Sequence, residues 1–240
     1  MKDQNFKRPR KKMGDFNFGK ETAIVFEDML KRSIPLYDEI QYMIGKIAGY
    51  CALDHTNVYD LGCSNGITLC TLAKYITKKV SLVGLDYSPE MLKEARVRFR
   101  RNNIAQPPKL MLADLNSPIK LTNASVVVLN LTLQFIRPLY RDQLVSSIYK
   151  GLVKNGCLIV IEKVLGSNSD FNRMFIQFYH EKKKENKYTD LEIAQKREAL
   201  ENILIPYRLD ENRKLFMRNG FSQFETFFKW FNFSGMLAIK

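Results

Sequence analysis

The sequence is poor in the residues that hold metal ions or covalent cross-links. It has four cysteines and two histidines among 240 residues, and no two cysteines form a Cys-x-x-Cys pair. The two histidines, His55 and His180, are far apart along the chain. This pattern argues against a zinc site and against a disulfide framework. We therefore expect no metal, and we predict reduced and mostly buried thiols.

Long apolar runs are missing as well. No stretch approaches the roughly 20 apolar residues that a membrane-spanning helix requires. The charged N-terminus is not followed by the apolar segment of a signal peptide. These absences argue against a membrane partner and lead us to expect a cytoplasmic protein. A chain of 240 residues has the length of one domain of ordinary to large size.

Basic residues outnumber acidic ones, which gives a formal net charge of +13. Part of this excess lies in residues 1–12, where the only acid is Asp3. That segment has one proline and no apolar periodicity, which predicts a disordered basic tail over residues 1–12 and a single domain over residues 13–240. The other lysines are scattered, as in the run Glu181–Lys187, so we expect RNA binding to be weak and salt-sensitive. A functional RNA site remains an alternative.

Hydrophobic periodicity divides the rest of the chain into helices and strands. Two predicted helices come first, at Glu21–Arg32 and Leu36–Tyr50. Short β-rich runs then alternate with helical stretches. The runs are Asn57–Leu61, Val80–Leu85, Lys109–Leu112, Ser125–Leu131 and Cys157–Ile161, and the helices between most of them are Thr68–Ile76, Pro89–Arg101 and Pro138–Val153. This order predicts a mostly parallel sheet with helices on both faces.

A helical insertion follows at about residues 167–205, with helices at Asp170–Asn186 and Thr189–Asn202. The chain closes with a helix at Leu209–Arg218 and two β-rich runs, Gln223–Lys229 and Phe231–Ile239, which are close enough to pair as an antiparallel hairpin. A mostly parallel sheet that ends in such a hairpin is the Rossmann-like α/β fold of class I S-adenosylmethionine-dependent methyltransferases. The classical dinucleotide-binding fold lacks the hairpin, so the pattern favours S-adenosylmethionine over NAD.

Glycines mark a turn directly after the first predicted strand. The run Asp60-Leu61-Gly62-Cys63-Ser64-Asn65-Gly66 leads into a helix, where glycines let the backbone approach a ligand and the helix N-terminus offers free amide donors. Asp86, Asp114 and Asn130 end or follow the next three strands, and ligands bind at this edge of parallel sheets. We therefore predict a nucleoside-type site. A structural turn, strand-end caps and a core hydrogen bond are the alternative interpretations.

An arginine interrupts the apolar stripe of the helix predicted at Thr189–Asn202. Arg197 shares one helical face with Ile193, Leu200 and Leu204. A guanidinium cannot lose its charge, so burying it requires an anionic partner. That partner is either Glu201, one turn further along the helix, or a carboxylate on a ligand that Arg197 holds bidentately. The spacing alone leaves both possibilities open.

Eight short segments carry a resemblance to a known family. They are Gly14-Asp15-Phe16, Phe26-Glu27-Asp28-Met29, Arg32-Ser33-Ile34-Pro35 with Tyr37, Tyr59-Asp60-Leu61-Gly62-Cys63-Ser64, Asn123-Ala124-Ser125, Leu129-Asn130 with Thr132-Leu133-Gln134-Phe135, Gln195-Lys196-Arg197 with Leu200-Glu201-Asn202, and Phe231-Asn232-Phe233. Over nearly the whole chain after the tail, the sequence resembles the carboxy-S-adenosyl-L-methionine synthases of bacterial tRNA wobble-uridine modification.

The resemblance implies a reaction other than methyl transfer. Family members combine S-adenosyl-L-methionine with prephenate and form carboxy-S-adenosyl-L-methionine, phenylpyruvate and water. A second enzyme then transfers the carboxymethyl group to tRNA, so no stable tRNA complex of this chain is expected. The resemblance also implies a homodimer. The alternative functions are an S-adenosylmethionine-dependent methyltransferase that acts on RNA or a small molecule, and a non-catalytic RNA-binding protein.

The resemblance further implies which residues contact the nucleoside ligand. Carried over by motif, they are Tyr37, Gly62, Cys63, Ser64, Asp86, Asp114, Leu115, Asn130 and Arg197. Arg197 is expected to bind the new carboxylate, which gives it the catalytic role. Tyr87 follows Asp86 where family members tend to carry asparagine. A tyrosine can stack or donate a hydrogen bond there, so Tyr87 is included among the predicted contacts.

Overall fold

The computed structural model describes residues 3, 5–9 and 14–240. The helices are α1 (Lys20–Ser33), α2 (Tyr37–Cys51), α3 (Ile67–Tyr75), α4 (Pro89–Arg101), α5 (Pro138–Gly151), α6 (Ser169–Glu185), α7 (Asp190–Leu200) and α8 (Leu209–Arg218). The strands are β1 (Asn57–Leu61), β2 (Ser81–Asp86), β3 (Lys109–Leu112), β4 (Ala124–Asn130), β5 (Leu152–Lys163), β6 (Gln223–Trp230) and β7 (Phe233–Ile239). A short 3-10 helix, η1 (Leu133–Phe135), follows β4.

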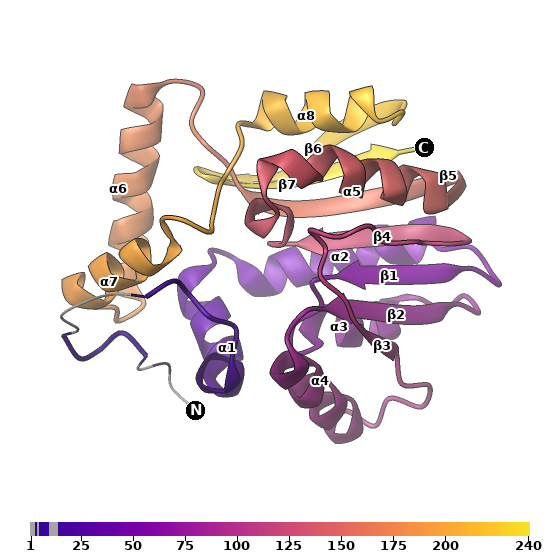
Figure 1. Ribbon diagram of the computed structural model, residues 1–240, viewed down its shortest axis with the longest axis horizontal. Helices are drawn as coiled ribbons and strands as arrows, with labels where there is room; N and C mark the ends of the chain where they lie inside the picture. Colours follow the sequence, from indigo (N-terminus) through magenta and orange to yellow (C-terminus); the bar gives the residue numbers. More distant parts are fainter. Residues whose placement is uncertain (1–2, 4, 10–13) are drawn as a thin grey trace.

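One seven-stranded sheet organises the chain, in the order β3-β2-β1-β4-β5-β7-β6 (Figure 1). Strands β1 to β5 run parallel, whereas β7 pairs antiparallel with both β5 and β6. The predicted fold, with its C-terminal hairpin and helical insertion, is therefore confirmed. The strand order reverses direction at β1 and β4, because β2 and β3 lie on one side of β1 and the later strands lie on the other. Ligands of open α/β sheets bind at such a reversal.

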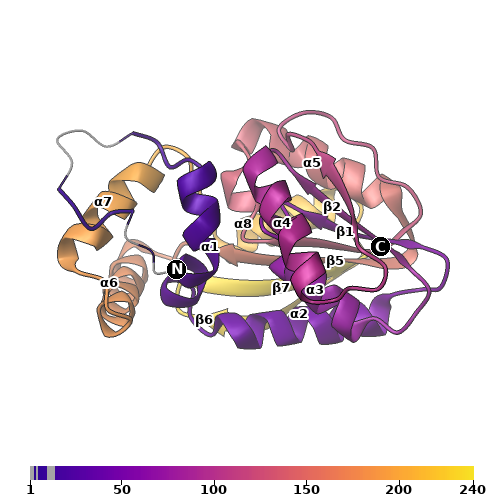
Figure 2. The same cartoon turned by 90° about the horizontal axis from the view of Figure 1, so that it is seen from below.

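Helices cover both faces of the sheet, and Figure 2 shows α2 and α5 on opposite sides of it. On one face, α5 and α8 bury apolar side chains such as Ile148 and Phe216 against the strands. On the other face, α2, α3 and α4 contribute a second core that includes Ile44 and Leu72. Both cores contain side chains with no exposed surface, so the carboxyl ends of the strands are held by a rigid support.

The insertion helices α6 and α7 lie with α1 beyond the carboxyl ends of the parallel strands (Figures 1 and 2). Helix α7 begins with the capping box predicted from Thr189 and Glu192: Glu192 N–H donates to the Thr189 hydroxyl, and the Glu192 carboxylate accepts from Thr189 N–H at 2.8 Å. This cap fixes the start of α7 and therefore the direction in which its side chains point.

The N-terminal segment differs from the expected disordered tail in residues 3 and 5–9. Asp3 and Phe6 are buried, and the side-chain amide of Gln195 on α7 donates to the backbone carbonyl of Phe6 at 2.7 Å. Asp3 is reached by Tyr188, whose hydroxyl donates to the Asp3 carboxylate at 3.2 Å. An apolar ring and an acid with specific partners therefore hold these residues against α1 and α7. The other residues of the predicted tail lie outside the described part of the chain.

Strand β5 is longer than the predicted run Cys157–Ile161 and begins directly after α5. Lys154 and Asn155 lay between the predicted helix Pro138–Val153 and the predicted run, but they belong to this strand, with Asn155 at a φ of 60°. Helix α5 ends at Gly151, where a Cβ atom would lie 2.5 Å from the Cβ atom of Leu121.

No helix among residues 3, 5–9 and 14–240 is both long enough and apolar enough to cross a membrane.

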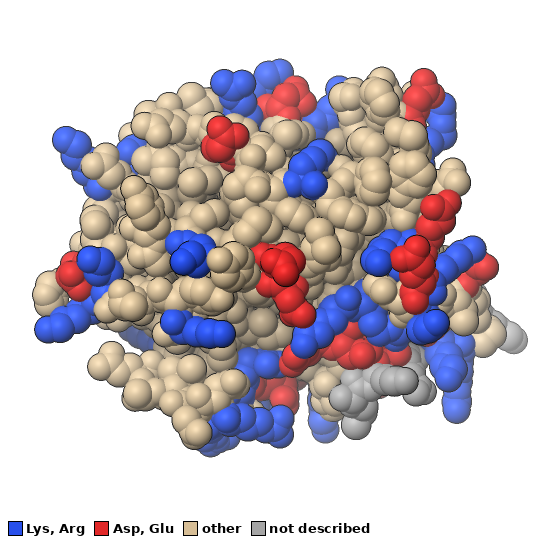
Figure 3. All heavy atoms as spheres, turned by 180° about the vertical axis from the view of Figure 1, so that it is seen from behind, with Lys and Arg blue, Asp and Glu red and all other residues tan. Residues whose placement is uncertain are grey.

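Acidic and basic side chains are mixed on one face of the molecule. Figure 3 shows lysines and arginines spread over the face opposite to that of Figure 1, with aspartates and glutamates among them. The exposed ion pairs include that of Arg218 with Asp142.

Candidate active site

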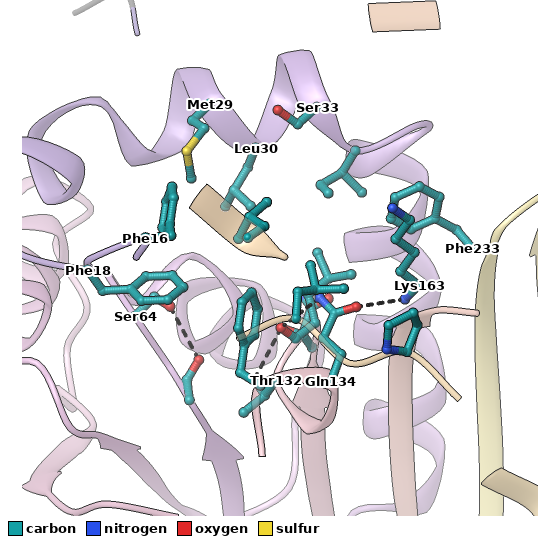
Figure 4. A pocket seen from close by; sticks show the side chains of 18 of the residues that line it. Phe16, Phe18, Met29, Leu30, Ser33, Ser64, Thr132, Gln134, Lys163 and Phe233 are labelled. Carbon is teal, nitrogen blue, oxygen red and sulfur yellow. Dashed lines mark hydrogen bonds between the residues drawn. The ribbon is translucent and has the colours of Figure 1, made fainter. Parts of the chain in front are cut away.

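All of the residues predicted to contact the nucleoside line one cavity at the carboxyl edge of the sheet. The cavity has a volume of about 600 Å³, which is in the usual range for a small-molecule site. The strand ends form its floor, and α1, α6 and α7 form the opposite walls. Figure 4 shows Met29, Leu30 and Ser33 of α1 on one side, with Ser64, Thr132 and Gln134 across from them. The positions are thus brought together, whereas their contacts with a ligand remain predictions.

The turn after β1 has a backbone conformation that favours glycine. Gly62 and Gly66 have φ values of 77° and 78°, in the left-handed region that side chains disfavour. At Gly62 a Cβ atom would lie 2.5 Å from the side chain of Thr132. Gly66 is the residue before α3. The amide groups at the start of α3 therefore remain close to the cavity.

Asp86, at the end of β2, holds this turn. Its carboxylate accepts hydrogen bonds from Ser64 N–H at 2.8 Å and from Ser88 N–H at 2.9 Å. Burial raises the pKa of Asp86, and the backbone hydrogen bonds oppose that rise. Each carboxylate oxygen keeps a further lone pair for a ligand hydroxyl. Asp86 thus combines support of the loop with the geometry expected of a ribose acceptor.

Unsatisfied acceptors near the turn provide a test of the predicted ligand. Both carboxylate oxygens of Asp60 are buried without a hydrogen-bond partner, as is the side-chain oxygen of Asn130. Burial, with the charge of Asp86, raises the pKa of Asp60 to about 8. The amide nitrogen of Asn130 donates to the hydroxyl of Thr68 at 3.1 Å. This bond fixes the orientation of the amide and leaves its oxygen available to accept from another group. Asn130 lines the cavity, whereas Asp60 does not. The free oxygen of Asn130 therefore fits an N–H donor of a ligand, which the ammonium group of S-adenosylmethionine offers.

Aromatic side chains form the wall beside Asp86, where Tyr87 was a predicted contact and Phe18 and Phe135 were not. The ring of Phe18 lies 6.2 Å from that of Tyr87 and 5.4 Å from that of Phe135, measured between centroids. Tyr87 is exposed on one side, which leaves its face available for stacking. Asp114 binds Asn116 N–H at 2.9 Å and is exposed at the rim. Rings next to polar rim groups suit a planar, hydrogen-bonding base such as adenine.

Arg197 differs from its predicted environment. Its side chain is exposed and lines the cavity, whereas the sequence predicted it within a buried stripe. The buried residues of α7 are Glu192, Ile193, Gln195, Lys196 and Ala199. The buried face is therefore shifted by one residue from the predicted face, from Arg197 to Lys196. Among the described residues, Arg197 forms no ion pair within 4.0 Å, and the alternative Arg197–Glu201 pair is therefore not formed. The guanidinium faces the cavity and remains free to bind an anion.

The cation that α7 does bury is Lys196. It is 5% exposed, and its Nζ atom donates to the hydroxyl of Ser33 on α1 at 2.9 Å. Burial lowers its pKa to about 8. The sequence contained a signal for this residue, since Lys196 stands beside Arg197 in a segment that carries the family resemblance.

Three further basic side chains line the same part of the cavity and were not singled out from the sequence. They are Lys163 at the end of β5, and His180 and Lys183 on α6. Burial, with the charge of Arg197 as the second cause, lowers the pKa of Lys163 to about 8. Burial also lowers the pKa values of His180 and Lys183, and the neighbouring cations lower them further. The cavity therefore has acidic side chains, Asp86 and Asp114, at the strand ends and a basic wall on β5, α6 and α7.

Comparisons with known proteins agree with this geometry. A family model described as a methyltransferase domain matches residues 58–156. A carboxy-S-adenosyl-L-methionine synthase of Methylococcus capsulatus is 49% identical over 100% of this chain and 99% of its own length. The chain belongs to the carboxy-S-adenosyl-L-methionine synthase family. A second member, from Aliivibrio fischeri, is 40% identical over 99% of this chain and 98% of its own length. The predicted resemblance is confirmed, and with it a dependence on S-adenosylmethionine.

Solved structures support the fold of this synthase family independently. The magnesium protoporphyrin IX methyltransferase of Synechocystis PCC 6803 superposes with a TM-score of 0.58 at 16% identity, over 89% of this chain and 84% of that chain. Among the described residues, no three His, Cys, Asp or Glu side chains are grouped so that they could hold a metal ion.

Proposed function

We propose that the chain converts S-adenosyl-L-methionine and prephenate into carboxy-S-adenosyl-L-methionine, phenylpyruvate and water. The observation that carries the proposal is Arg197, an unpaired guanidinium in the same cavity as the glycine turn. A methyltransferase has no use for a cation near its methyl donor, because a neutral methyl group gives a guanidinium nothing to pair with. A product with a new carboxylate on that methyl group gives the guanidinium an anion to pair with.

The acidic side of the cavity binds the sulfonium substrate in this proposal. Asp86 accepts from the ribose, the amide groups of the glycine turn meet the amino-acid end, and the side-chain oxygen of Asn130 accepts from the ammonium group. Tyr37 and Leu115 are buried and line the cavity, so they exclude water from the bound ligand. These residues orient the methyl group, and none of them needs to act as a strong base.

The bound substrate supplies a methyl group that the adjacent sulfonium makes acidic enough to lose a proton. Prephenate loses its ring carboxyl as carbon dioxide and its ring hydroxyl as hydroxide, and becomes aromatic, which drives the reaction. The hydroxide takes the methyl proton to form water, and the methyl carbon bonds to the carbon dioxide. The chain must hold the two substrates close together and dry. Arg197 then stabilises the charge of the carboxylate that forms.

The product is suited to a subsequent transfer of its carboxymethyl group, which we propose serves tRNA wobble-uridine modification by a second enzyme. The mixed charge of the face that Figure 3 shows supports this division of labour. A chain that only supplies the small-molecule donor does not need a continuous basic face for tRNA.

The test is incubation of the purified protein with S-adenosyl-L-methionine and prephenate, followed by mass spectrometry of the nucleoside. We expect a product that is heavier than S-adenosyl-L-methionine by one carboxyl group in place of a hydrogen, formed in equal amount with phenylpyruvate. Omission of prephenate is the control and should abolish the product. Formation of S-adenosylhomocysteine with a methylated acceptor would instead establish the methyltransferase alternative.

A further inference from the structure

The basic wall of the cavity contains more positive charge than the new carboxylate requires. Lys163 and Lys183 both point at the ring of Tyr179, with their Nζ atoms 5.2 and 4.3 Å from its centroid. Neither lysine forms an ion pair with an acid among the described residues. Two ammonium groups at one ring repel each other, and an anion bound between them offsets that repulsion. This pair therefore favours a negatively charged ligand of its own.

A second observation at the same place is an amide without partners. Asn232 lies in the turn between β6 and β7, is 1% exposed and lines the cavity, yet neither its side-chain nitrogen nor its oxygen has a hydrogen-bond partner. A buried amide left unsatisfied is costly, and such groups in native proteins usually have a ligand or water as their partner. The turn places it beside Lys163, since Asn232 C=O accepts from Val164 N–H at 2.8 Å.

The walls around these three side chains are aromatic. The ring of Tyr179 lies 5.3 Å from that of Phe233, and Phe233 pairs with Lys163 across the β5–β7 register. Figure 4 shows Lys163 and Phe233 together at the opposite end of the view from Phe16, Phe18 and Ser64. A ligand here needs an anionic group for the lysines, a hydrogen-bonding group for the amide, and a flat apolar body for the rings.

We propose that Lys163, Lys183 and Asn232 bind a carboxylate of the organic acid co-substrate, other than the new carboxylate that is assigned to Arg197. This inference rests on the proposed function, because prephenate carries two carboxylates. The one bound here is the pyruvyl carboxylate, which remains in phenylpyruvate. Tight pairing of the ring carboxylate would stabilise the charge that must leave it and would slow its loss as carbon dioxide. The keto group next to the pyruvyl carboxylate is an acceptor for the amide of Asn232.

The experiment measures binding of phenylpyruvate and of its uncharged methyl ester by calorimetry, in the presence of S-adenosyl-L-methionine. The variants are Lys163→Met, Lys183→Met and Asn232→Leu. Each variant should bind phenylpyruvate roughly tenfold more weakly or worse and should keep its affinity for S-adenosyl-L-methionine. The two lysine variants should also show a smaller preference for the acid over the ester. Lys183→Arg, which keeps the charge, should recover part of the loss.

Lys184→Met is the matched control, because Lys184 is the next residue on α6 and pairs with Asp190 at the surface. It should bind phenylpyruvate like the wild type. Asn232→Leu also separates binding from folding, since it removes an unpartnered polar group and should not lower the thermal stability. A stability loss with unchanged phenylpyruvate affinity would show a purely structural role and overturn the subsite.

The proposed function is tested separately by turnover of prephenate in the wild type. If the wild type forms the carboxylated nucleoside but all variants bind phenylpyruvate equally well, the subsite is wrong and the function stands. If the wild type forms no product from prephenate, the function fails. Selective loss of phenylpyruvate binding in the variants would then still identify an organic-anion site.

Discussion

The Nζ atom of Lys196 donates a 2.9 Å hydrogen bond to the hydroxyl of Ser33 and thereby joins α7 to α1. The same hydroxyl lies 3.1 Å from the hydroxyl of Tyr188, which donates to the carboxylate of Asp3 at 3.2 Å. A buried chain of hydrogen bonds thus connects three segments that are far apart in the sequence. Because Arg197 is adjacent to Lys196, this network also sets where the exposed guanidinium enters the cavity.

Ser33→Ala should destabilise the protein. The substitution removes two buried hydrogen bonds and leaves the Lys196 ammonium without its hydroxyl partner, which costs on the order of 1–3 kcal/mol of unfolding free energy. Denaturant unfolding of the ligand-free protein measures the effect. Ser222→Ala is the control, since the Ser222 hydroxyl is exposed and makes only a 3.3 Å contact. Equal unfolding midpoints for the two variants would contradict the importance of the network.

Asp3→Ala should have a similar effect, in contrast to what a disordered tail predicts. The Asp3 carboxylate is buried and accepts from Tyr188, so its removal leaves a buried hydroxyl less well satisfied, at a cost of about 1–2 kcal/mol. Thermal unfolding is a suitable measurement. Asp15→Ala, at an exposed acid, is the comparison and should unfold like the wild type. If Asp3→Ala does too, the contacts of the Asp3 side chain contribute nothing to stability.

The sequence predicted the fold well because strand and helix periodicities were strong in the regions that form the core. Val126 to Leu129 are all fully buried, and such a run is typical of a strand that is covered on both faces. The boundaries of β5 were less predictable. Lys154 and Asn155 have turn-forming composition, but pairing of the neighbouring Leu152 with Ala124 extends the strand through them. Pairing between distant segments is not visible in local sequence.

The nucleoside side of the cavity was also predictable, because Gly62, Asp86 and Asn130 occur at strand ends where topology brings them together. The basic wall was not. Lys163 and Lys183 come from different elements, and only the packing of Tyr179 on α6 against β7 brings them to one ring. The helical wheel also misassigned burial between the neighbours Lys196 and Arg197. A wheel assumes one buried stripe, whereas α7 contacts both α1 and the N-terminal segment.

The pH dependence of stability offers a third prediction. Burial lowers the pKa of Lys196 from the ordinary 10.5 to about 8. Between these two values the unfolded chain binds more protons than the folded chain, so this lysine makes the free energy of unfolding rise with pH from about 8 to 10.5. The difference in unfolding free energy between the wild type and Lys196→Met should therefore shift in favour of the wild type over this window. A difference that stays constant with pH would contradict the assignment.

The final prediction concerns ligand selectivity at Arg197. Arg197→Ala should weaken binding of carboxy-S-adenosyl-L-methionine roughly 10- to 100-fold, the loss expected for a hydrogen-bonded charge pair. The effect on S-adenosyl-L-methionine should be much smaller, because that ligand lacks the additional carboxylate. Arg197→Lys should recover only part of the loss, since an ammonium cannot reproduce the planar, two-pronged contact of a guanidinium. Calorimetry with both ligands gives the ratio of the two affinities directly.

The unfolding free energy of Arg197→Ala distinguishes this role from a structural one. Arg197 is exposed and has no ion-pair partner among the described residues, so its removal should leave stability within a few tenths of a kcal/mol of the wild type. Arg173→Ala provides a matched control, because Arg173 is an exposed arginine of α6 that pairs with Asp170 at the surface. That control should preserve the affinity ratio of the two ligands. If Arg197→Ala lowered both affinities equally, the guanidinium would not bind the additional carboxylate, and the basis for assigning synthase chemistry to this residue would be lost.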